Sequence, residues 1–419
     1  MPGLRRIFKS VLFSNIYNLF LLYGFSHIIP IVLMPFLLNT IGVEHYGLVN
    51  FSLAFAFYFQ VVNEFGFDLS NVRHIVGNRD DKDKISEVAS SIVCCKLQIF
   101  AVLAVIYTLA VLCVGSLREH WVLYMLAYVR ILGICVSLNW LFRSMENLKY
   151  VTRISMIVKT LCVLPIFVLV RSQADYVWVM VFFTLQEVVG GVVSLLLAKR
   201  IYAIRLYPVR LSTSLYYLKD SIPFFTSTFL TRIYQTSNSV ILGIFCGDYA
   251  VGVYTAAQKL HNAYASFVSP LLAHVFYPYF MRRIDFAVIN RIVRFVIVGN
   301  IAMLFACYLL SPYVLPLFVK VETEHIVTYF NMFLLLLAVS VPADMFGYPY
   351  LGAMDMVDKV NRSAVYTSAL YFVGAAVIML AGGITVESVI WLLLATNLFC
   401  LLYRVRCICR VRTSMSRCL

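Results

Sequence analysis

Residues 88–115 read VASSIVCCKLQIFAVLAVIYTLAVLCVG, an apolar run that contains a single charged residue, Lys96. A helix needs about 20 apolar residues to cross the hydrocarbon core of a bilayer, and this run is long enough. The 419-residue chain has the same character throughout, because 62% of its residues are apolar and 13% are charged. About 25% of the residues in a soluble domain are charged. The composition therefore excludes a soluble enzyme, a secreted disulfide scaffold and a disordered protein.

The sequence predicts an all-α integral membrane protein with about twelve transmembrane helices. Its mean hydropathy of +0.87 is too high for one soluble core, because a folded domain exposes a large surface to its solvent. The bilayer must be the solvent for most of the chain. The spans are expected at residues 11–38, 47–67, 88–115, 121–142, 154–170, 177–198, 222–244, 253–277, 295–318, 326–349, 363–382 and 388–403.

The basic residues alternate along this set of spans. The N-terminus, the connections after even-numbered spans and the C-terminal tail carry 26 of the 34 Lys and Arg residues, and the other connections carry three. Cytoplasmic connections of membrane proteins are enriched in Lys and Arg. We therefore expect both termini in the cytoplasm. The net charge of +14 is attributed to this topology and to attraction of the basic C-terminal tail to anionic lipid, not to nucleic acid.

The chain has a weak internal repeat. The connection after the first span contains Gly42-x4-Gly47, and the connection after the seventh contains Gly247-x4-Gly252. With six spans on each side of the midpoint, this indicates two parallel repeats, an arrangement common in transporters. The predicted domains are an N-terminal six-helix bundle, residues 1–205, and a C-terminal six-helix bundle with a short basic cytoplasmic tail, residues 206–419.

Two stretches resemble a known family. Residues 35–96 read PFLLNTIGVEHYGLVNFSLAFAFYFQVVNEFGFDLSNVRHIVGNRDDKDKISEVASSIVCCK, and Ser221-x-Pro223-Phe224-Phe225 precedes AAQKLHNAYASFVSPL at residues 256–271. They resemble Wzx-type polysaccharide flippases, bacterial members of the multidrug/oligosaccharidyl-lipid/polysaccharide exporter superfamily. The resemblance implies two six-helix bundles around a central cavity. It also implies translocation of an undecaprenyl-diphosphate-linked oligosaccharide from the cytoplasmic to the periplasmic leaflet of the bacterial inner membrane, beside other glycan-assembly membrane proteins.

Cationic residues inside the predicted spans are the first candidates for substrate binding. A Lys or Arg at the bilayer centre costs about 2.5–3.5 kcal/mol, so such residues are usually functional or paired. In an interior cavity they would bind a lipid diphosphate, which Arg can grip with two hydrogen bonds. Two alternatives remain open: structural ion pairs with acids in the spans and, for Lys159, extension to the interface. The candidates are Lys96, Arg130, Lys159, Arg232 and Lys259.

Titratable groups inside the spans are candidates for ion coupling. An antiporter driven by H+ or Na+ needs a proton acceptor or an ion ligand in its pathway. Glu187 is the deepest and our first choice, whereas Glu64 and Asp344 are closer to the predicted cytoplasmic ends. His27 is a candidate proton relay, with a hydrogen-bonded core histidine as its alternative.

No cofactor is expected. The sequence has neither a Cys/His metal-ligand spacing nor a GxxxxGK[ST] phosphate loop, so a metal site and a built-in ATPase are disfavoured. The energy must then come from a gradient, with H+ or Na+ as the coupling ion, from a separate partner or from removal of the product. Two other functions stay open: a membrane polymerase or ligase of the same glycan pathway, and an exporter of another substrate in the superfamily. A polymerase or ligase generally needs a large periplasmic loop, and the predicted connections on that side are all short. The cationic residues inside the spans disfavour a cationic drug as the substrate of an exporter.

Overall fold

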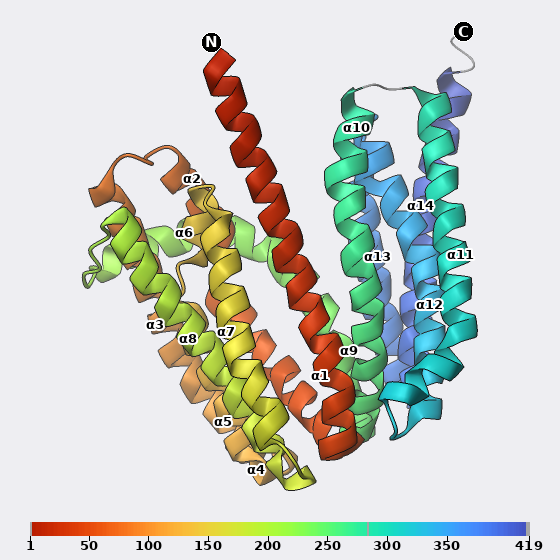
Figure 1. Cartoon of the computed structure of the whole chain (residues 1–419), viewed down its shortest axis with the longest axis horizontal. Helices are drawn as coiled ribbons and strands as arrows, with labels where there is room; N and C mark the ends of the chain where they lie inside the picture. The colour runs from red at the N-terminus through yellow and green to blue at the C-terminus, as the bar shows by residue number, and fades with distance from the viewer. Residues whose placement is uncertain (1, 283–284, 416–419) are drawn as a thin grey trace. The chain divides into compact units, whose positions relative to one another are not determined.

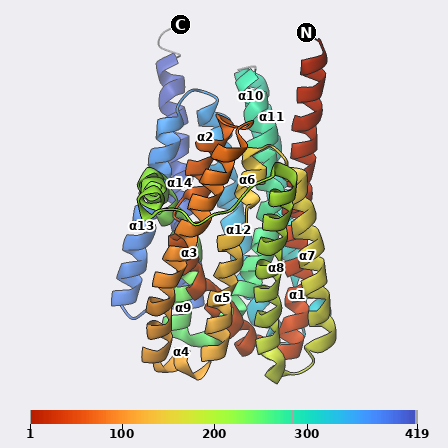
Figure 2. The same cartoon turned by 90° about the vertical axis from the view of Figure 1, so that its left-hand side faces the viewer.

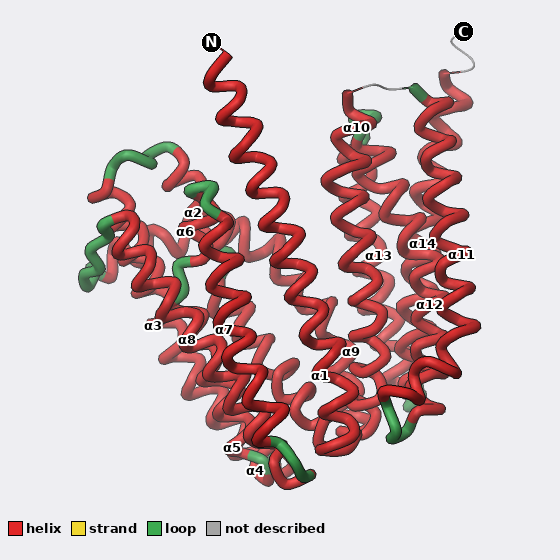
Figure 3. Tube along the Cα trace, in the orientation of Figure 1, coloured by secondary structure: helices red, strands yellow, loops and turns green. Residues whose placement is uncertain are grey.

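The computed structural model describes residues 2–282 and 285–415, and these residues form helices joined by short loops, with no strand among them (Figure 3). Apolar spans satisfy their backbone hydrogen bonds within each helix, as a bilayer requires. The helices are α1 (Pro2–Glu64), α2 (Phe67–Val76), α3 (Lys82–Cys113), α4 (Gly115–Glu119), α5 (Trp121–Val136), α6 (Asn139–Ser144), α7 (Leu148–Leu169), η1 (Gln173–Asp175), α8 (Tyr176–Tyr202), α9 (Leu211–Leu271), η2 (Leu272–Phe276), α10 (Tyr277–Arg282), α11 (Phe286–Phe318), α12 (Thr323–Met345), η3 (Phe346–Gly352), α13 (Val357–Leu380) and α14 (Val386–Met415).

Two long helices are each interrupted by one glycine. In α1, Gly42 has φ 79° and ψ 166°, and in α9, Gly247 has φ 81° and ψ 179°. Glycine adopts positive φ readily because it has no Cβ. Each of these helices therefore consists of two helical segments joined at one of the two predicted glycine turns.

The interruptions account for the number of spans. Among the residues that the structure describes, 10 helices are long and apolar enough to cross a membrane. Two of these, Ile28–Glu64 and Thr236–Leu271, contain the turns at Gly42 and Gly247. Counting the segments on either side of each glycine separately gives the twelve helical segments expected from the sequence.

Contacts divide the chain into two compact units. Unit 1 comprises Met1–Phe25 and Leu48–Val240, and unit 2 comprises Ser26–Gly47 and Ile241–Leu419. The first part of α9 thus clusters with the N-terminal helices. The end of the first segment of α1 clusters with the C-terminal helices.

Side-chain contacts explain this division. In unit 1, the Ser70 hydroxyl on α2 lies 2.6 Å from the Ser221 hydroxyl on α9. In unit 2, the Asn39 amide on α1 donates a hydrogen bond of 2.7 Å to the carbonyl of Phe318 and accepts one of 2.8 Å from the backbone N–H of Lys320. These bonds attach the crossing segments to the helices on which they pack.

Each unit is a helical bundle. In unit 1, α5 packs against α3 and α8, and α7 packs against α8 (Figure 2). Its core includes Phe67, Phe142 and Tyr217, all essentially inaccessible to solvent. In unit 2, α12 packs against α11 and α14, and α13 packs against α14. The end of α10, the start of α11 and the end of α14 lie at the same end of unit 2 (Figure 1).

Candidate functional site

A polar cavity of about 220 Å³ lies within unit 1. Its walls come from α1, α2, α3, α5, α6 and α8, with one residue from the α5–α6 connection. Three acidic and three basic residues line the cavity, so the predicted bases Lys96 and Arg130 lie among acids. The lining residues are Gln60, Glu64, Asp68, Lys96, Arg130, Ile134, Ser137, Asn139, Trp140, Arg143 and Glu187.

The turn between α1 and α2 places two of the acids. Phe65 and Gly66 both have positive φ, 44° and 72°, and they end α1 directly after Glu64. The ring of Phe65 stacks on that of Phe225, with centroids 4.4 Å apart and planes 6° from parallel. This contact holds the turn against α9. Glu64 and Asp68 therefore stand on either side of one fixed turn and both line the cavity.

A close approach of two helices places the third acid beside an arginine. A Cβ on Gly191 of α8 would collide with the carbonyl oxygen of Gly133 on α5, so the two backbones touch. Small residues allow membrane helices to pack this closely. Arg130 and Glu187 lie about one turn before these glycines. Their side chains meet, with Arg130 Nη1 3.8 Å from Glu187 Oε1.

Two further ion pairs complete the cluster. Lys96, only 2% exposed, places its Nζ 3.5 Å from Asp68 Oδ1, and Arg232 Nη1 donates to Glu64 Oε2. Burial raises the pKa of Asp68, but the positive charges of Lys96, Arg143 and Arg232 outweigh burial and hold this pKa below its usual value of 3.8. Asp68 is therefore ionised at neutral pH. Acid–base pairing offsets the cost of placing these charges in the bundle.

A hydrogen-bond chain links two of the three ion pairs, and two N–H donors beside it have no partner among the described residues. Arg130 Nη2 donates to Gln60 Oε1 at 2.9 Å, and Gln60 Nε2 donates to Glu64 Oε1 at 2.8 Å. Glu64 in turn accepts from Arg232. Among the residues that the structure describes, Arg130 Nε and Trp140 Nε1 are buried N–H groups with no hydrogen-bond partner. Such groups are costly unless a ligand or water satisfies them.

The structure brings most of the predicted unit 1 residues together. Lys96, Arg130 and Glu187 line the cavity, and Arg232 reaches its edge through the bond to Glu64. Lys159 on α7 interacts electrostatically with Glu187. Arg130 and Arg232 pair with acids of the predicted spans, as in the ion-pair alternative, whereas Lys96 pairs with Asp68, which directly follows a predicted span.

The remaining predicted residues belong to unit 2. Lys259 Nζ lies 4.8 Å from the centroid of the Tyr46 ring, a cation–π contact. Asp344 Oδ1 lies 3.8 Å from Arg404 Nη1. His27 lies outside the residues whose side chains the structure describes.

Arg404 departs from its predicted place. The last predicted span ends at residue 403, so we expected Arg404 in the basic C-terminal tail. Its side chain is instead buried among helices, and it donates 2.6 Å and 3.0 Å hydrogen bonds to the carbonyl of Ala343 and the hydroxyl of Ser363. A Cβ on Gly347 would lie 2.7 Å from Arg404 Nη1. The absence of a side chain at Gly347 thus makes room for the guanidinium, which a sequence pattern does not reveal.

Sequence reasoning missed two charged residues of the cavity. Asp68 and Arg143 each directly follow a predicted span, and both were counted with the polar connections. The structure places both in the cavity wall. The available signal for Asp68 was Gly66, a turn-forming residue at the end of an apolar stretch with an acid on each side.

Solved structures share this fold. An inward-facing multidrug resistance MATE family transporter of the MOP superfamily matches with a TM-score of 0.64 at 15% identity, covering 93% of this chain and 95% of that one. A second structure, MATE in the straight conformation, matches with a TM-score of 0.53 at 14% identity, covering 97% of each chain. The predicted fold class, an all-α multi-pass membrane protein of two helical bundles, is confirmed.

Two curated relatives carry the name "Putative O-antigen transporter". The protein of Escherichia coli (strain K12) is 25% identical over 269 residues, which cover 64% of this chain and 65% of the relative. The protein of Shigella dysenteriae is 26% identical over 267 residues, which cover 63% of this chain and 66% of the relative. The matched region is less than two thirds of each relative's length.

A family model shows the relationship directly. The model described as "Polysaccharide biosynthesis protein" matches residues 12–283 of this chain. The match includes the whole cavity of unit 1 and extends well beyond half of the chain. The chain therefore belongs to the polysaccharide biosynthesis protein family.

Proposed function

We propose that this protein is a flippase that translocates undecaprenyl-diphosphate-linked oligosaccharide units from the cytoplasmic to the periplasmic leaflet of the bacterial inner membrane. Translocation proceeds by alternating access, in which the binding site opens to one leaflet and then to the other. The relatives named as O-antigen transporters and the family of polysaccharide biosynthesis proteins support this choice of substrate class. The protein works beside other membrane proteins of glycan assembly, and both of its termini are cytoplasmic.

The observation that carries the proposal is the charged cavity of unit 1. Its arginines can each present two N–H groups to phosphate oxygens, a geometry suited to a diphosphate. The buried N–H groups of Arg130 and Trp140 that lack partners are donors for an anionic or hydroxyl-rich ligand. The cavity also offers the amides of Gln60 and Asn139, which suit sugar hydroxyls.

The ion pairs suggest how binding couples to a cation. A diphosphate that takes Arg130 and Arg232 as partners displaces Glu187 and Glu64 from them. An unpaired carboxylate in a span is costly and takes up a proton or a sodium ion. Export driven by an inward H+ or Na+ gradient requires the cation and the substrate to be carried in turn, so Glu187 and Glu64 release the cation to the cytoplasm before the diphosphate is carried outward. Glu64 keeps the hydrogen bond from Gln60 during this exchange of partners.

The test is a deletion strain in which two quantities are measured: the surface-glycan profile and the leaflet location of the lipid-linked repeat units. A flippase loss abolishes transfer of even single units and leaves repeat units on the cytoplasmic leaflet. Restoration by the wild-type chain and not by the Arg130→Ala/Arg232→Ala double variant, at equal membrane levels, assigns the effect to the cavity.

Two results would overturn the proposal. Transfer of single units without long chains would identify a polymerase instead. An unchanged glycan profile, with lipid-linked units still reaching the periplasmic leaflet, would identify an exporter of another substrate.

A further inference from the structure

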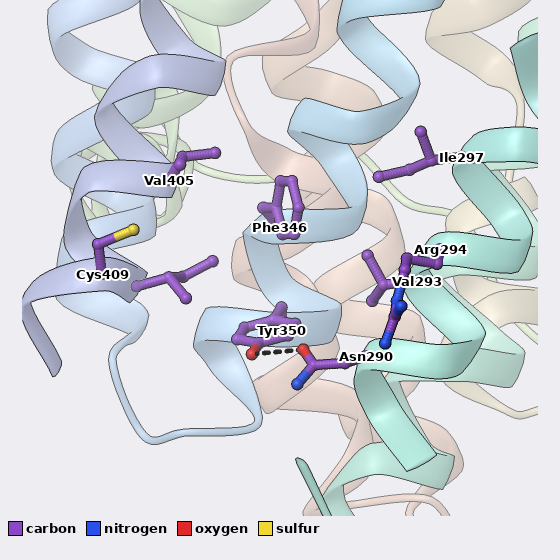
Figure 4. Close-up of a pocket in the computed structure, with 9 residues that line it drawn as sticks. Asn290, Val293, Arg294, Ile297, Phe346, Tyr350, Val405 and Cys409 are labelled. Atoms are coloured by element: carbon purple, nitrogen blue, oxygen red, sulfur yellow. Dashed lines mark hydrogen bonds between the residues drawn. The ribbon is translucent and has the colours of Figure 1, made fainter. Parts of the chain in front are cut away.

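A second cavity, of about 390 Å³, lies within unit 2 at the end where α14 finishes (Figure 4). Its volume falls within the ~300–1,000 Å³ range of small-ligand sites. It is formed by α11, η3 and α14, and none of its residues takes part in the cluster of unit 1. We refer to it as the α11–α14 groove. It is lined by Asn290, Val293, Arg294, Ile297, Phe346, Tyr350, Val405, Ile408 and Cys409.

The groove changes from polar to apolar along its length. Figure 4 shows the hydrogen bond that the Tyr350 hydroxyl donates to the side-chain oxygen Oδ1 of Asn290 at one end, a distance of 3.1 Å, with the Arg294 guanidinium beside it. Ile297 and Phe346 lie toward the other end. On α11, Ile297 is seven residues beyond Asn290, which corresponds to about 10 Å along the helix axis. The groove therefore has a polar mouth and an apolar interior.

The polar mouth carries positive charge. Arg294 is exposed and forms no ion pair with any residue that the structure describes. Arg291 lies one turn before it on α11, and Arg406 and Arg410 are exposed on the part of α14 that reaches the same end. The distribution of basic residues predicts that this end faces the cytoplasm. The mouth would then lie at the level of the cytoplasmic lipid headgroups.

We propose that the α11–α14 groove binds an anionic phospholipid of the cytoplasmic leaflet. The phosphate of the lipid contacts Arg294 at the mouth, and the Tyr350 and Asn290 side chains supply polar contacts beside it. One acyl chain lies along Ile297 and Phe346. Basic pockets between helices on the cytoplasmic side of membrane proteins bind anionic headgroups, and this groove adds an apolar channel for the chain. The inference rests on the predicted orientation and not on the proposed transport activity.

Native mass spectrometry of the purified chain tests the proposal, with phosphatidylglycerol as the anionic probe and phosphatidylethanolamine of the same acyl chains as the neutral comparison. The wild-type chain should retain phosphatidylglycerol in preference to phosphatidylethanolamine. Arg294→Gln should weaken retention of phosphatidylglycerol about five-fold, because one cation near the headgroup is lost. Arg153→Gln, at an exposed cation on α7 outside the groove, is the matched control and should leave retention unchanged.

A second pair of variants tests the apolar channel. Ile297→Trp fills the interior of the groove and should reduce retention of phosphatidylglycerol, whereas Val298→Trp, on the 65% exposed neighbouring position, should not. Elution volume and thermal midpoint in detergent show whether each variant is folded, so loss of binding is counted only for folded protein.

Three outcomes would overturn the inference. Equal retention of the two phospholipids would show that the headgroup charge is not recognised. An unchanged affinity in both Arg294→Gln and Ile297→Trp would place bound lipid elsewhere. Displacement of phosphatidylglycerol from the wild-type chain by an equimolar polyprenyl phosphate, with an equal loss of polyprenyl phosphate binding in Arg294→Gln, would show that the groove binds the prenyl carrier instead.

Discussion

Gly47 packs directly against the backbone carbonyl of Asp248, so that no side chain fits between the two. The corresponding residues of the other repeat make the same contact in reverse, because Gly252 packs against the carbonyl of Val43. All four residues belong to unit 2. The two Gly-x4-Gly turns therefore face each other as a pair related by approximate two-fold symmetry. The weak internal repeat in the sequence reflects the need for a residue without a side chain at each of these contacts.

Gly47→Ala should destabilise the protein, because the added Cβ collides with backbone that cannot rotate away. Overpacking of this kind costs about 1–3 kcal/mol. Thermal midpoints in detergent measure the effect. Gly299→Ala is the matched control, because a Cβ there meets nothing within 4 Å, and it should leave the midpoint unchanged or slightly raised. Equal midpoints for wild type and Gly47→Ala would refute the packing argument.

Asp68→Asn should be more destabilising than Asp68→Asn combined with Lys96→Met. The single change leaves Lys96, 2% exposed, without its carboxylate, and removal of one partner of a buried pair costs about 3–5 kcal/mol. The double change removes the stranded charge. Unfolding midpoints of the four members of this cycle give the coupling between the two side chains. A double variant less stable than the single one would contradict the pairing.

The same pair sets a pH dependence. Because the pKa of Asp68 is lower in the folded protein than its ordinary value of 3.8, the contribution of the carboxylate to stability is complete above that value. The contribution is lost as the pH falls through the folded-state pKa. The difference in midpoint between wild type and Asp68→Asn should therefore stay constant from about pH 5 to pH 8 and shrink in more acidic buffer. A difference that shrank already near pH 6 would show that this pKa is raised.

Arg232→Ala should reduce glycan export about ten-fold at normal membrane levels. The variant removes a charge-assisted donor, and such hydrogen bonds contribute about 1.5–3 kcal/mol. Export is read from the ratio of periplasmic to cytoplasmic lipid-linked units. Arg153→Ala, at an exposed cation on α7 that does not line the cavity, serves as the control. Wild-type export in both Arg232→Ala and Arg130→Ala would defeat the role proposed for the cavity.

Gly347→Ala and Arg404→Gln should each destabilise unit 2, and their effects should not add. The Cβ at position 347 displaces the guanidinium from the Ala343 carbonyl and the Ser363 hydroxyl, and the second change removes the same bonds. Residues that share one network show interaction energies of about 0.5–3 kcal/mol. Unfolding midpoints of the two single variants and the double variant measure this energy. Strict additivity would mean that the two residues act independently.

A reporter enzyme fused after Leu419 should give a cytoplasmic signal, since 26 of the 34 Lys and Arg residues fall in segments on that predicted side. A second fusion within the connection between α11 and α12 should give a periplasmic signal. The opposite pair of results would reverse the orientation on which the proposed direction of transport depends.

The periodic and compositional features of this fold were predictable, and its contacts were not. Apolar length predicts helices such as α3, and Gly42 and Gly247 marked both interrupted helices. Neither signal tells which acid meets which base. Arg130 reaches Glu187 because two glycines on different helices remove the side chains between them, and that depends on helix rotation.

Connections were the other source of error. Arg143 was predicted in a polar connection because it follows an apolar stretch. In the structure it lies on α6 and lines the cavity. Arg404 looked like the start of a basic tail, yet α14 continues to Met415 and buries it. Hydropathy reports the end of the apolar stretch and not the end of the helix, so charged residues just beyond a span are the ones it misplaces.

The bond between Glu64 and Arg232 also has a consequence for how the chain is made. The two residues are 168 positions apart, so at about 5–20 residues per second a ribosome adds Arg232 roughly 8–34 s after Glu64. The amide of Gln60, one turn earlier on the same helix, is a donor to this acid that is made before it. The polar network of the first repeat is thus completed only when the second repeat has begun to emerge, which ties the assembly of the two repeats together in time.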